Sequence, residues 1–249
     1  MKSLDASAPD QKTCDAGATP CLRISVIIPV LDEARCLGDR LAELSAIHGI
    51  HERIVVDGDS RDGTTEIARS FAGAQVIAAP RGRASQMNAG ARLASGDVFL
   101  FLHADTSLPA DAAHWIRRAL ADPAVVGGAF RTWTVTDSGS TWLSPLLHLA
   151  DVRSRYSRLP YGDQAIFVRA DAFWRLGGFP ELPLMEDLEL SRRLRRIGQV
   201  RTVPAVVRVS GRRFLSRPLY YTFLVNIFPS LYRMGVAPRL LASLYGDPR

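Results

Sequence analysis

Short runs of apolar, mostly β-branched residues alternate with helix-patterned segments in the N-terminal half of the chain. Residues 24–30 (ISVIIPV) form the first run, and residues 53–56 (RIVV) form the second. Between them, Leu37, Leu41 and Leu44 recur at helical spacing. Roughly thirty residues separate the starts of the two runs, which is the length of a βαβ unit. The alternation therefore predicts an α/β fold with right-handed crossovers between parallel strands.

The alternation continues up to Pro109, and the order of elements changes after it. Before Pro109 we expect a helix opening at 62–66 with Thr64 or Thr65 as its cap, strands at 75–78 and 98–102, and a helix over 84–94. After Pro109 we expect a helix over 111–121, a strand at 127–135 and a helical stretch beginning near residue 140. Further along we expect a strand at 164–168, a charged helix over 186–197, and an extended segment at 200–209 that is broken at Pro204. This order predicts a mixed central sheet flanked by helices.

The chain has the size and composition of one globular domain with a small appendage. It holds 249 residues, of which 47% are hydrophobic and 22% charged. We expect a disordered tail over residues 1–22, one domain over 23–213 and a helical extension over 214–249. The tail lacks the apolar core of a secretion signal, and the most apolar stretch, 219–232, is shorter than the roughly 20 residues that cross a bilayer. We therefore predict a cytoplasmic protein.

The positive charge is confined to the C-terminal part. Residues 1–150 carry a net charge of −3, whereas residues 151–249 carry +9. Such an excess favours an anionic partner, and 29 of the 31 basic residues are arginines, whose planar fork suits phosphate. No zinc module, basic helix with interleaved aromatics or other reader motif accompanies the charge, so nucleic acid is not an expected partner.

Acidic residues follow three of the predicted strands directly. They include Glu33 after the first strand, Asp57 after the second and Asp105 after the strand at 98–102. The carboxyl ends of parallel strands meet at one edge of a sheet, and ligands bind there. Clustered carboxylates repel one another unless a cation or hydrogen-bond donors lie between them, and a metal with a nucleotide would satisfy them. The alternative is that Asp and Gly merely form the turns and caps of βα loops.

Five successive segments of the chain form a recognisable series: SVIIPVLDE (25–33), VVDGDSRDGT (55–64), RGRASQMNAG (81–90), GDVFLFLHAD (96–105) and MEDLEL (185–190). In order and spacing they resemble the signature segments of the family 2 inverting glycosyltransferases with a GT-A fold. Three further segments are FLHADT (101–106), GDQAIFVR (162–169) and YRMGVAPRLLASLY (232–245). They resemble, more specifically, a bacterial subgroup associated with arsenosugar biosynthesis and with radical-SAM and selenium domains. The resemblance covers residues 24–245 and implies a GT-A-like fold and a sugar-transferring activity.

The resemblance also implies roles for the acidic residues in the nucleotide half. Asp57 matches the aspartate that binds the base of a UDP- or GDP-type donor, and Glu33 matches a second acidic nucleotide contact. Asp105 matches the last aspartate of the Asp-X-Asp signature, which holds a divalent cation, Mn²⁺ or Mg²⁺, on the diphosphate. The first acidic position of that signature is His103 here. An imidazole can ligate Mn²⁺ but suits Mg²⁺ poorly, so His103 is a metal ligand or a packed histidine.

The remaining implied roles concern the transfer step. Asp187 matches the general base that removes the acceptor proton, while Glu186 beside it and Asp163 are candidates for acceptor binding. For Glu186 and Asp187 the alternative is favourable decoration of a helix N-terminus. Arginines are candidates for the diphosphate, with a solvated basic face as the alternative: Arg81, Arg83, Arg212 and Arg213.

The C-terminal segment 214–245 mixes aromatic and aliphatic residues with arginine. It is a candidate for peripheral contact with the inner face of a membrane, or for packing on the catalytic body or a second subunit. Two rivals to the transferase remain: a catalytically silent sugar-nucleotide binder, which the replacement at His103 favours, and a sugar-phosphate nucleotidyltransferase. The latter normally needs a glycine-rich loop after the first strand, where residues 31–34 are LDEA. The sequence leaves the acceptor open between a small metabolite, a lipid carrier and a glycan, and it does not indicate the oligomeric state.

Overall fold

The computed structural model describes residues 22–135, 159–211 and 218–246, and within these ranges the chain builds one eight-stranded sheet. The predicted tail and the helical stretch expected near residue 140 lie outside the described residues. The strands are β1 (Ile24–Val30), β2 (Ile50–Asp57), β3 (Ala74–Ala78), β4 (Val98–Phe101), β5 (Thr106–Ser107), β6 (Val125–Val135), β7 (Phe167–Arg169) and β8 (Gln199–Ser210). The helices are α1 (Ala34–Ala46), α2 (Thr64–Ser70), α3 (Arg83–Leu93), α4 (Ala112–Ala119), α6 (Ala170–Arg175), α7 (Glu186–Ile197), α9 (Pro218–Arg233) and α10 (Pro238–Tyr245).

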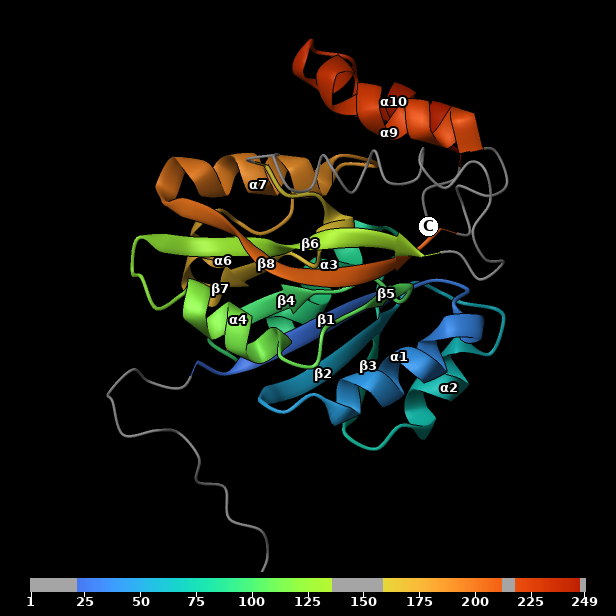
Figure 1. Ribbon diagram of the computed structural model, residues 1–249. Coiled ribbons are helices and arrows are strands. Elements are labelled where there is room, and N and C mark those ends of the chain that lie inside the picture. The colour runs from blue at the N-terminus through green and yellow to red at the C-terminus, as the bar shows by residue number, and fades with distance from the viewer. Residues whose placement is uncertain (1–21, 136–158, 212–217, 247–249) are drawn as a thin grey trace, which may run out of the picture.

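The sheet has a parallel half and a mixed half, joined at β4. Its strand order is β3-β2-β1-β4-β7-β6-β8-β5, and the first four strands run parallel to one another. β7 pairs antiparallel with both β4 and β6, and β6 then pairs parallel with the long β8 (Figure 1). The alternation of strands and helices before Pro109 and its loss afterwards therefore correspond to the two halves of the sheet.

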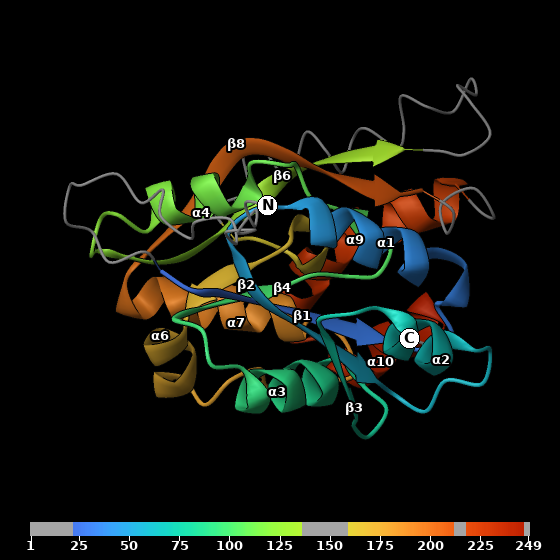
Figure 2. The same ribbon diagram turned by 90° about the horizontal axis from the view of Figure 1, so that it is seen from below.

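Helices cover both faces of the sheet. On β1, Val26 and Ile28 pack with α1 and α4, whereas Ile27 packs with α3, α6 and α7. Figure 2 shows these two groups of helices on opposite sides of the strands. Burial on both faces explains why β1 is apolar throughout except for Ser25, rather than alternating.

Three local expectations need correction. The helix α2 is capped by Gly63, not by Thr64 or Thr65, because the Thr64 hydroxyl accepts from the Glu33 N–H (2.8 Å) instead. Residues 162–164 form a short 3-10 turn, so the strand expected from residue 164 begins only at β7. Pro204 does not break β8. It lies in a register shift, where the pairing advances by four residues on β8 and by two on β6. No ladder hydrogen bond is required of Pro204 there, so its missing N–H costs nothing.

The C-terminal helices α9 and α10 form a hairpin, called here the α9–α10 hairpin, which is the outermost layer at the top of Figure 1. Its inner side buries Leu224, Phe228 and Leu241 with Leu184, in the loop that leads into α7. No helix in the described ranges combines the length and the apolar character that a membrane span requires.

Candidate active site

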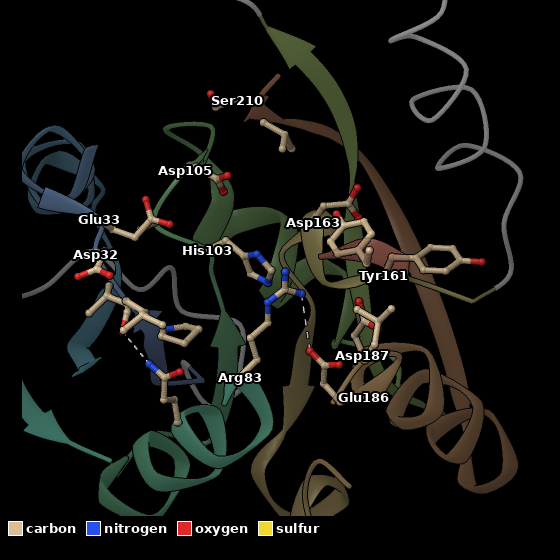
Figure 3. Close-up of a pocket in the computed structure, with 18 of the residues that line it drawn as sticks. Asp32, Glu33, Arg83, His103, Asp105, Tyr161, Asp163, Glu186, Asp187 and Ser210 are labelled. Carbon is tan, nitrogen blue, oxygen red and sulfur yellow. Dashed lines mark hydrogen bonds and ion pairs between the residues drawn. The ribbon is translucent and has the colours of Figure 1, made fainter. Parts of the chain in front are cut away.

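A cavity of about 640 Å³ opens at the carboxyl edge of the parallel strands, between the body and the α9–α10 hairpin. The loops after β1 and β4 supply Glu33, His103 and Asp105, the turn before β7 supplies Asp163, and the start of α7 supplies Glu186 and Asp187 (Figure 3). Arg83, the first residue of α3, also lines it. These seven residues, predicted from separate segments of the sequence, are therefore brought together.

Reciprocal hydrogen bonds hold the loops after β1 and β2 against each other. The Asp32 N–H donates to the Ser60 hydroxyl (3.0 Å), and the Arg61 N–H donates to the Asp32 carboxylate (2.8 Å). Asp32 adopts a left-handed conformation with φ of 53°, which Asp tolerates better than most residues. This fixed turn sets the position of Glu33 at the cavity wall.

Asp57 lies beside the cavity but is not among the residues that line it. It ends β2 opposite Val30 of β1, which does line the cavity. Its side chain is buried, and its carboxylate accepts hydrogen bonds from the backbone N–H and the hydroxyl of Ser60. In this conformation Asp57 stabilises the loop after β2, and its predicted contact with a nucleotide base stays a prediction.

Arg83 and Glu186 form an ion pair at the centre of the site, with 3.7 Å between Nη1 and Oε1. Only 4% of the Glu186 side chain is exposed, against 24% for Arg83. Burial and the neighbouring Asp187 charge raise the pKa of Glu186 to about 7, although Arg83 acts in the opposite direction. Burial works to lower the pKa of Arg83, but Glu186, Tyr245 and the two aspartates 187 and 105 together raise it. Glu186 is therefore part-protonated near neutral pH, while Arg83 stays charged.

The Asp187 carboxylate is held at the N-terminus of α7. It accepts from the Gly162 N–H and, at 2.7 Å, from the Leu188 N–H. A Cβ at position 162 would lie 2.9 Å from Asp187 Oδ2 and 3.0 Å from His103 Nε2, so the glycine lets both side chains approach the same backbone. Met185, just before α7, has a φ of 73°, a strained value for a non-glycine residue that sets the direction of the helix start.

The structure tests whether His103 and Asp105 fit a divalent cation. The described residues contain no cluster of three His, Cys, Asp or Glu side chains arranged to hold a metal. In Figure 3 the His103 imidazole lies beside the Arg83 guanidinium, while the Asp105 carboxylate projects separately into the cavity. Asp105 thus fits the role of a single carboxylate ligand. The other ligands of the cation would come from the phosphate groups of a bound nucleotide, as is common for Mg²⁺ and Mn²⁺.

Several residues of the site were missed from the sequence. The buried Gln86 side chain donates to the carbonyls of Val30 and Val56 and ties α3 to the ends of β1 and β2. Its signal was present, since it lies in the segment 81–90 that carries the family resemblance. Tyr245 lines the cavity from α10 and ends the segment 232–245 that carries the subgroup resemblance, but its place at the cavity follows only from the packing of the α9–α10 hairpin. Other lining residues not anticipated are Arg35, Tyr161, Ser210 and Phe228.

The predicted diphosphate arginines divide into two groups. Arg83 lies in the cavity, and the exposed Arg81 lines a smaller cavity of about 200 Å³ on the other side of the Arg83–Glu186 pair. Arg212 and Arg213 lie outside the described residues.

Comparison with known protein families shows which family the chain belongs to. Residues 25–177, more than half of the chain, match the family described as glycosyl transferase family 2. The chain belongs to this family. A Bacillus subtilis (strain 168) protein named probable glycosyltransferase YdaM is 24% identical over 210 residues, covering 74% of this chain and 50% of that protein. An N-acetylglucosaminyltransferase of Rhizobium sp. (strain N33) is 30% identical over 137 residues, covering 51% of this chain and 30% of that protein. The chain thus spans half or less of these two curated relatives.

Solved structures confirm the fold. A mannosyltransferase of Pyrobaculum calidifontis, solved with GDP-Man and Mn²⁺, superposes with a TM-score of 0.66 at 22% identity, covering 94% of this chain and 72% of that one. TarS of S. aureus, solved with UDP-GlcNAc, superposes with a TM-score of 0.58 at 19% identity, covering 76% of this chain and 58% of that one. The mixed sheet flanked by helices is therefore the GT-A-like fold that the sequence predicted.

Proposed function

We propose that the protein transfers a sugar from a nucleoside diphosphate sugar to an acceptor, with inversion of the anomeric carbon. The observation that carries the proposal is that Glu33, Asp105 and Asp187, from three distant segments, line one cavity beside Arg83. Membership of glycosyl transferase family 2 supports the reaction class, and neighbours of the same fold were solved with GDP-Man and UDP-GlcNAc.

In this proposal Asp187 is the general base. The acceptor oxygen attacks C1 of the donor sugar, its proton passes to the Asp187 carboxylate, and the bond from C1 to the diphosphate oxygen breaks on the opposite face. One such displacement inverts C1. Asp187 suits this role better than Glu186, because Glu186 is almost fully buried and is already paired with Arg83.

The donor occupies the side of the cavity formed by β1, β4 and α3. Glu33 and Asp57 lie where a nucleoside, of UDP or GDP type, would meet the ends of β1 and β2, and Arg83 would meet the diphosphate. A divalent cation held by Asp105 and the diphosphate oxygens would neutralise the charge that develops on the departing phosphate. His103, close to Asp187 through Gly162, is available as a ligand or as a neighbour of the base.

The acceptor side is the part of the cavity near Asp163, Tyr161 and the α9–α10 hairpin. Asp163 and Glu186 remain the proposed acceptor contacts. An arsenic- or selenium-containing small molecule stays a prediction that rests on the sequence resemblance alone.

The experiment compares Asp187→Asn with wild type on a panel of GDP- and UDP-sugars, with cell extract as the acceptor source and product detection by mass spectrometry. Loss of the base is expected to lower turnover by about 10²- to 10⁴-fold. Nucleotide binding, measured by thermal shift with Mn²⁺, is expected to persist because Asp187 faces the acceptor side. Asp171→Asn, an exposed carboxylate on α6, is the matched control and should retain full turnover.

Each rival function predicts a different result. A silent binder would show the thermal shift but no transfer by wild type with any donor or metal. A sugar-phosphate nucleotidyltransferase would form nucleoside triphosphate from the donor and pyrophosphate. Unchanged turnover in Asp187→Asn would remove the assigned base, and a product with retained C1 configuration by NMR would refute the single displacement.

A further inference from the structure

The outer side of the α9–α10 hairpin carries an unusual share of exposed apolar surface. Nine large hydrophobic side chains are exposed among the described residues, and five of them lie on this hairpin. Phe223 is 61% exposed and Met234 is 80% exposed. We define the outer face by these five residues: Tyr220, Phe223, Met234, Leu240 and Leu244. Exposed apolar groups concentrated in this way mark an interaction surface.

The outer face is continuous across the two helices. Tyr220 and Phe223 are one helical turn apart on α9, Leu240 and Leu244 are one turn apart on α10, and the Tyr220 hydroxyl donates to the Leu244 carbonyl (2.5 Å). The inner side of the same hairpin is already buried against the loop before α7. The hairpin therefore carries apolar side chains on both sides, although Asn226 and Ser230 are also exposed on α9, and only the inner side has a partner within the described chain.

The charges on the hairpin have a single sign. Residues 218–245 contain no aspartate or glutamate, and their two charged residues, Arg233 and Arg239, are both exposed. Exposed apolar side chains with basic neighbours and no carboxylate match the composition of interfacial helices on anionic bilayers. A symmetric contact between two copies of this face would instead bring four arginines into one interface, and the hairpin supplies no carboxylate to compensate them.

We propose that the outer face of the α9–α10 hairpin docks on an anionic lipid membrane. Phe223, Met234 and Leu240 would enter the boundary between headgroups and acyl chains, while Arg233 and Arg239 would meet lipid phosphates. The hairpin lies at the outer end of the molecule, so the body does not obstruct the approach (Figure 1).

Docking in this orientation has a consequence for the acceptor, which rests on the proposed function. Phe228, Pro229 and Tyr245 of the same hairpin line the cavity, and Leu184 joins the hairpin to the start of α7, where Asp187 lies. A membrane bound to the outer face would therefore lie on the acceptor side of the site. The acceptor class that this geometry favours is a polar group carried by a membrane lipid.

The test is flotation of the full chain with vesicles of phosphatidylcholine alone and of phosphatidylcholine mixed with phosphatidylglycerol, at low and high salt. Wild type is expected to float with the mixed vesicles and to lose most binding without the anionic lipid or at high salt. The double variant Phe223→Ser/Met234→Ser is expected to bind about ten-fold more weakly or worse. The control Leu93→Ser/Val206→Thr removes two apolar groups that are also exposed, at 43% and 40%, but lie on the body, and it should bind as wild type.

The outcomes separate this proposal from the proposed function. Equal binding by the double variant and wild type, or no binding to anionic vesicles, would overturn the docking surface. So would a wild-type dimer in light scattering that the double variant abolishes, because the face would then join two copies. A cooperative thermal unfolding transition like that of wild type confirms that each variant is folded, whether or not the protein binds a nucleotide. Vesicle binding without any transfer activity would leave the docking surface standing and refute only the transferase.

Discussion

Glu186 offers the sharpest test of the electrostatics of the site, because a single substitution should change how stability depends on pH. Glu186 is buried at the start of α7 beside Asp187, and its pKa is raised from 4.5 to about 7 by burial first and by the Asp187 charge second. The folded protein thus keeps a proton that the unfolded chain has lost. Glu186→Gln removes this titration while preserving the shape of the side chain.

The size of this effect on stability follows from the linkage between proton binding and unfolding. Because the folded-state pKa lies above the unfolded value, the stabilising contribution is fully present below about pH 4.5 and is lost as the pH rises through about 7. Between about pH 5 and pH 8 wild type should lose about 2 to 3 kcal/mol of unfolding free energy through this group alone. The Gln variant lacks this loss, so its stability relative to wild type should increase by the same amount over that window.

Urea denaturation of both proteins at intervals across this pH window measures the difference directly. Any constant offset from the altered Arg83 contact cancels, since only the change with pH is compared. Glu181→Gln, an exposed carboxylate just before α7, should run parallel to wild type. In an Asp187→Asn background the stability loss should move to lower pH, because the second cause of the shift is gone. A constant difference between Glu186→Gln and wild type from pH 5 to 8 would refute the assigned titration.

Three further predictions concern the contacts around Asp187, the donor and the cation. Gly162→Ala should lower turnover about ten-fold or more, because the new methyl group would lie 2.9 Å from the Asp187 carboxylate. The control is Gly38→Ala, whose methyl group would lie 3.7 Å from its nearest neighbour, and it should leave turnover unchanged. Arg83→Gln should raise the dissociation constant for a nucleoside diphosphate about ten-fold in calorimetry, and an unchanged constant would exclude the phosphate contact. Mn²⁺ should bind weakly alone and tightly with nucleotide, and Asp105→Asn should abolish this synergy; tight binding of Mn²⁺ alone would contradict a half-formed site.

The fold was predictable where local pattern and tertiary environment agree. The charged helix was expected over 186–197 and is α7, because its apolar positions and its acidic first turn both signal the same start. The ends of α4 differ from expectation by one and two residues, as helix ends fray, and β2 begins three residues earlier than expected. The turn at residues 162–164 could not be predicted from the local sequence. It depends on hydrogen bonds between Tyr161 and Gln164, and these replace the extended conformation that we expected from residue 164 onwards.

The residues of the site that directly follow a strand could be predicted from the sequence. Carboxylates after β1 and β4 were expected at one edge, and Glu33 and Asp105 meet there. The sequence did not reveal that Asp57 would turn to Ser60, nor that His103 would approach Gly162 and Asp187. The first detail is a side-chain turn between residues only three apart, and the second depends on packing between segments more than twenty residues apart. Hydrophobic periodicity encodes neither.

The charge balance of the cavity accounts for why a cation belongs to the proposed reaction although the described residues form no complete metal cage. Seven carboxylates line the cavity, against two arginines, Arg35 and Arg83. Arg83 is already paired with Glu186, so a diphosphate entering this space would meet net repulsion unless positive charge or protons entered with it. A proton on Glu186 would release Arg83 from its partner, and a divalent ion held by Asp105 would reduce the remaining repulsion. Under the proposed function, the same carboxylates would therefore make binding of the donor depend on a divalent ion and on pH.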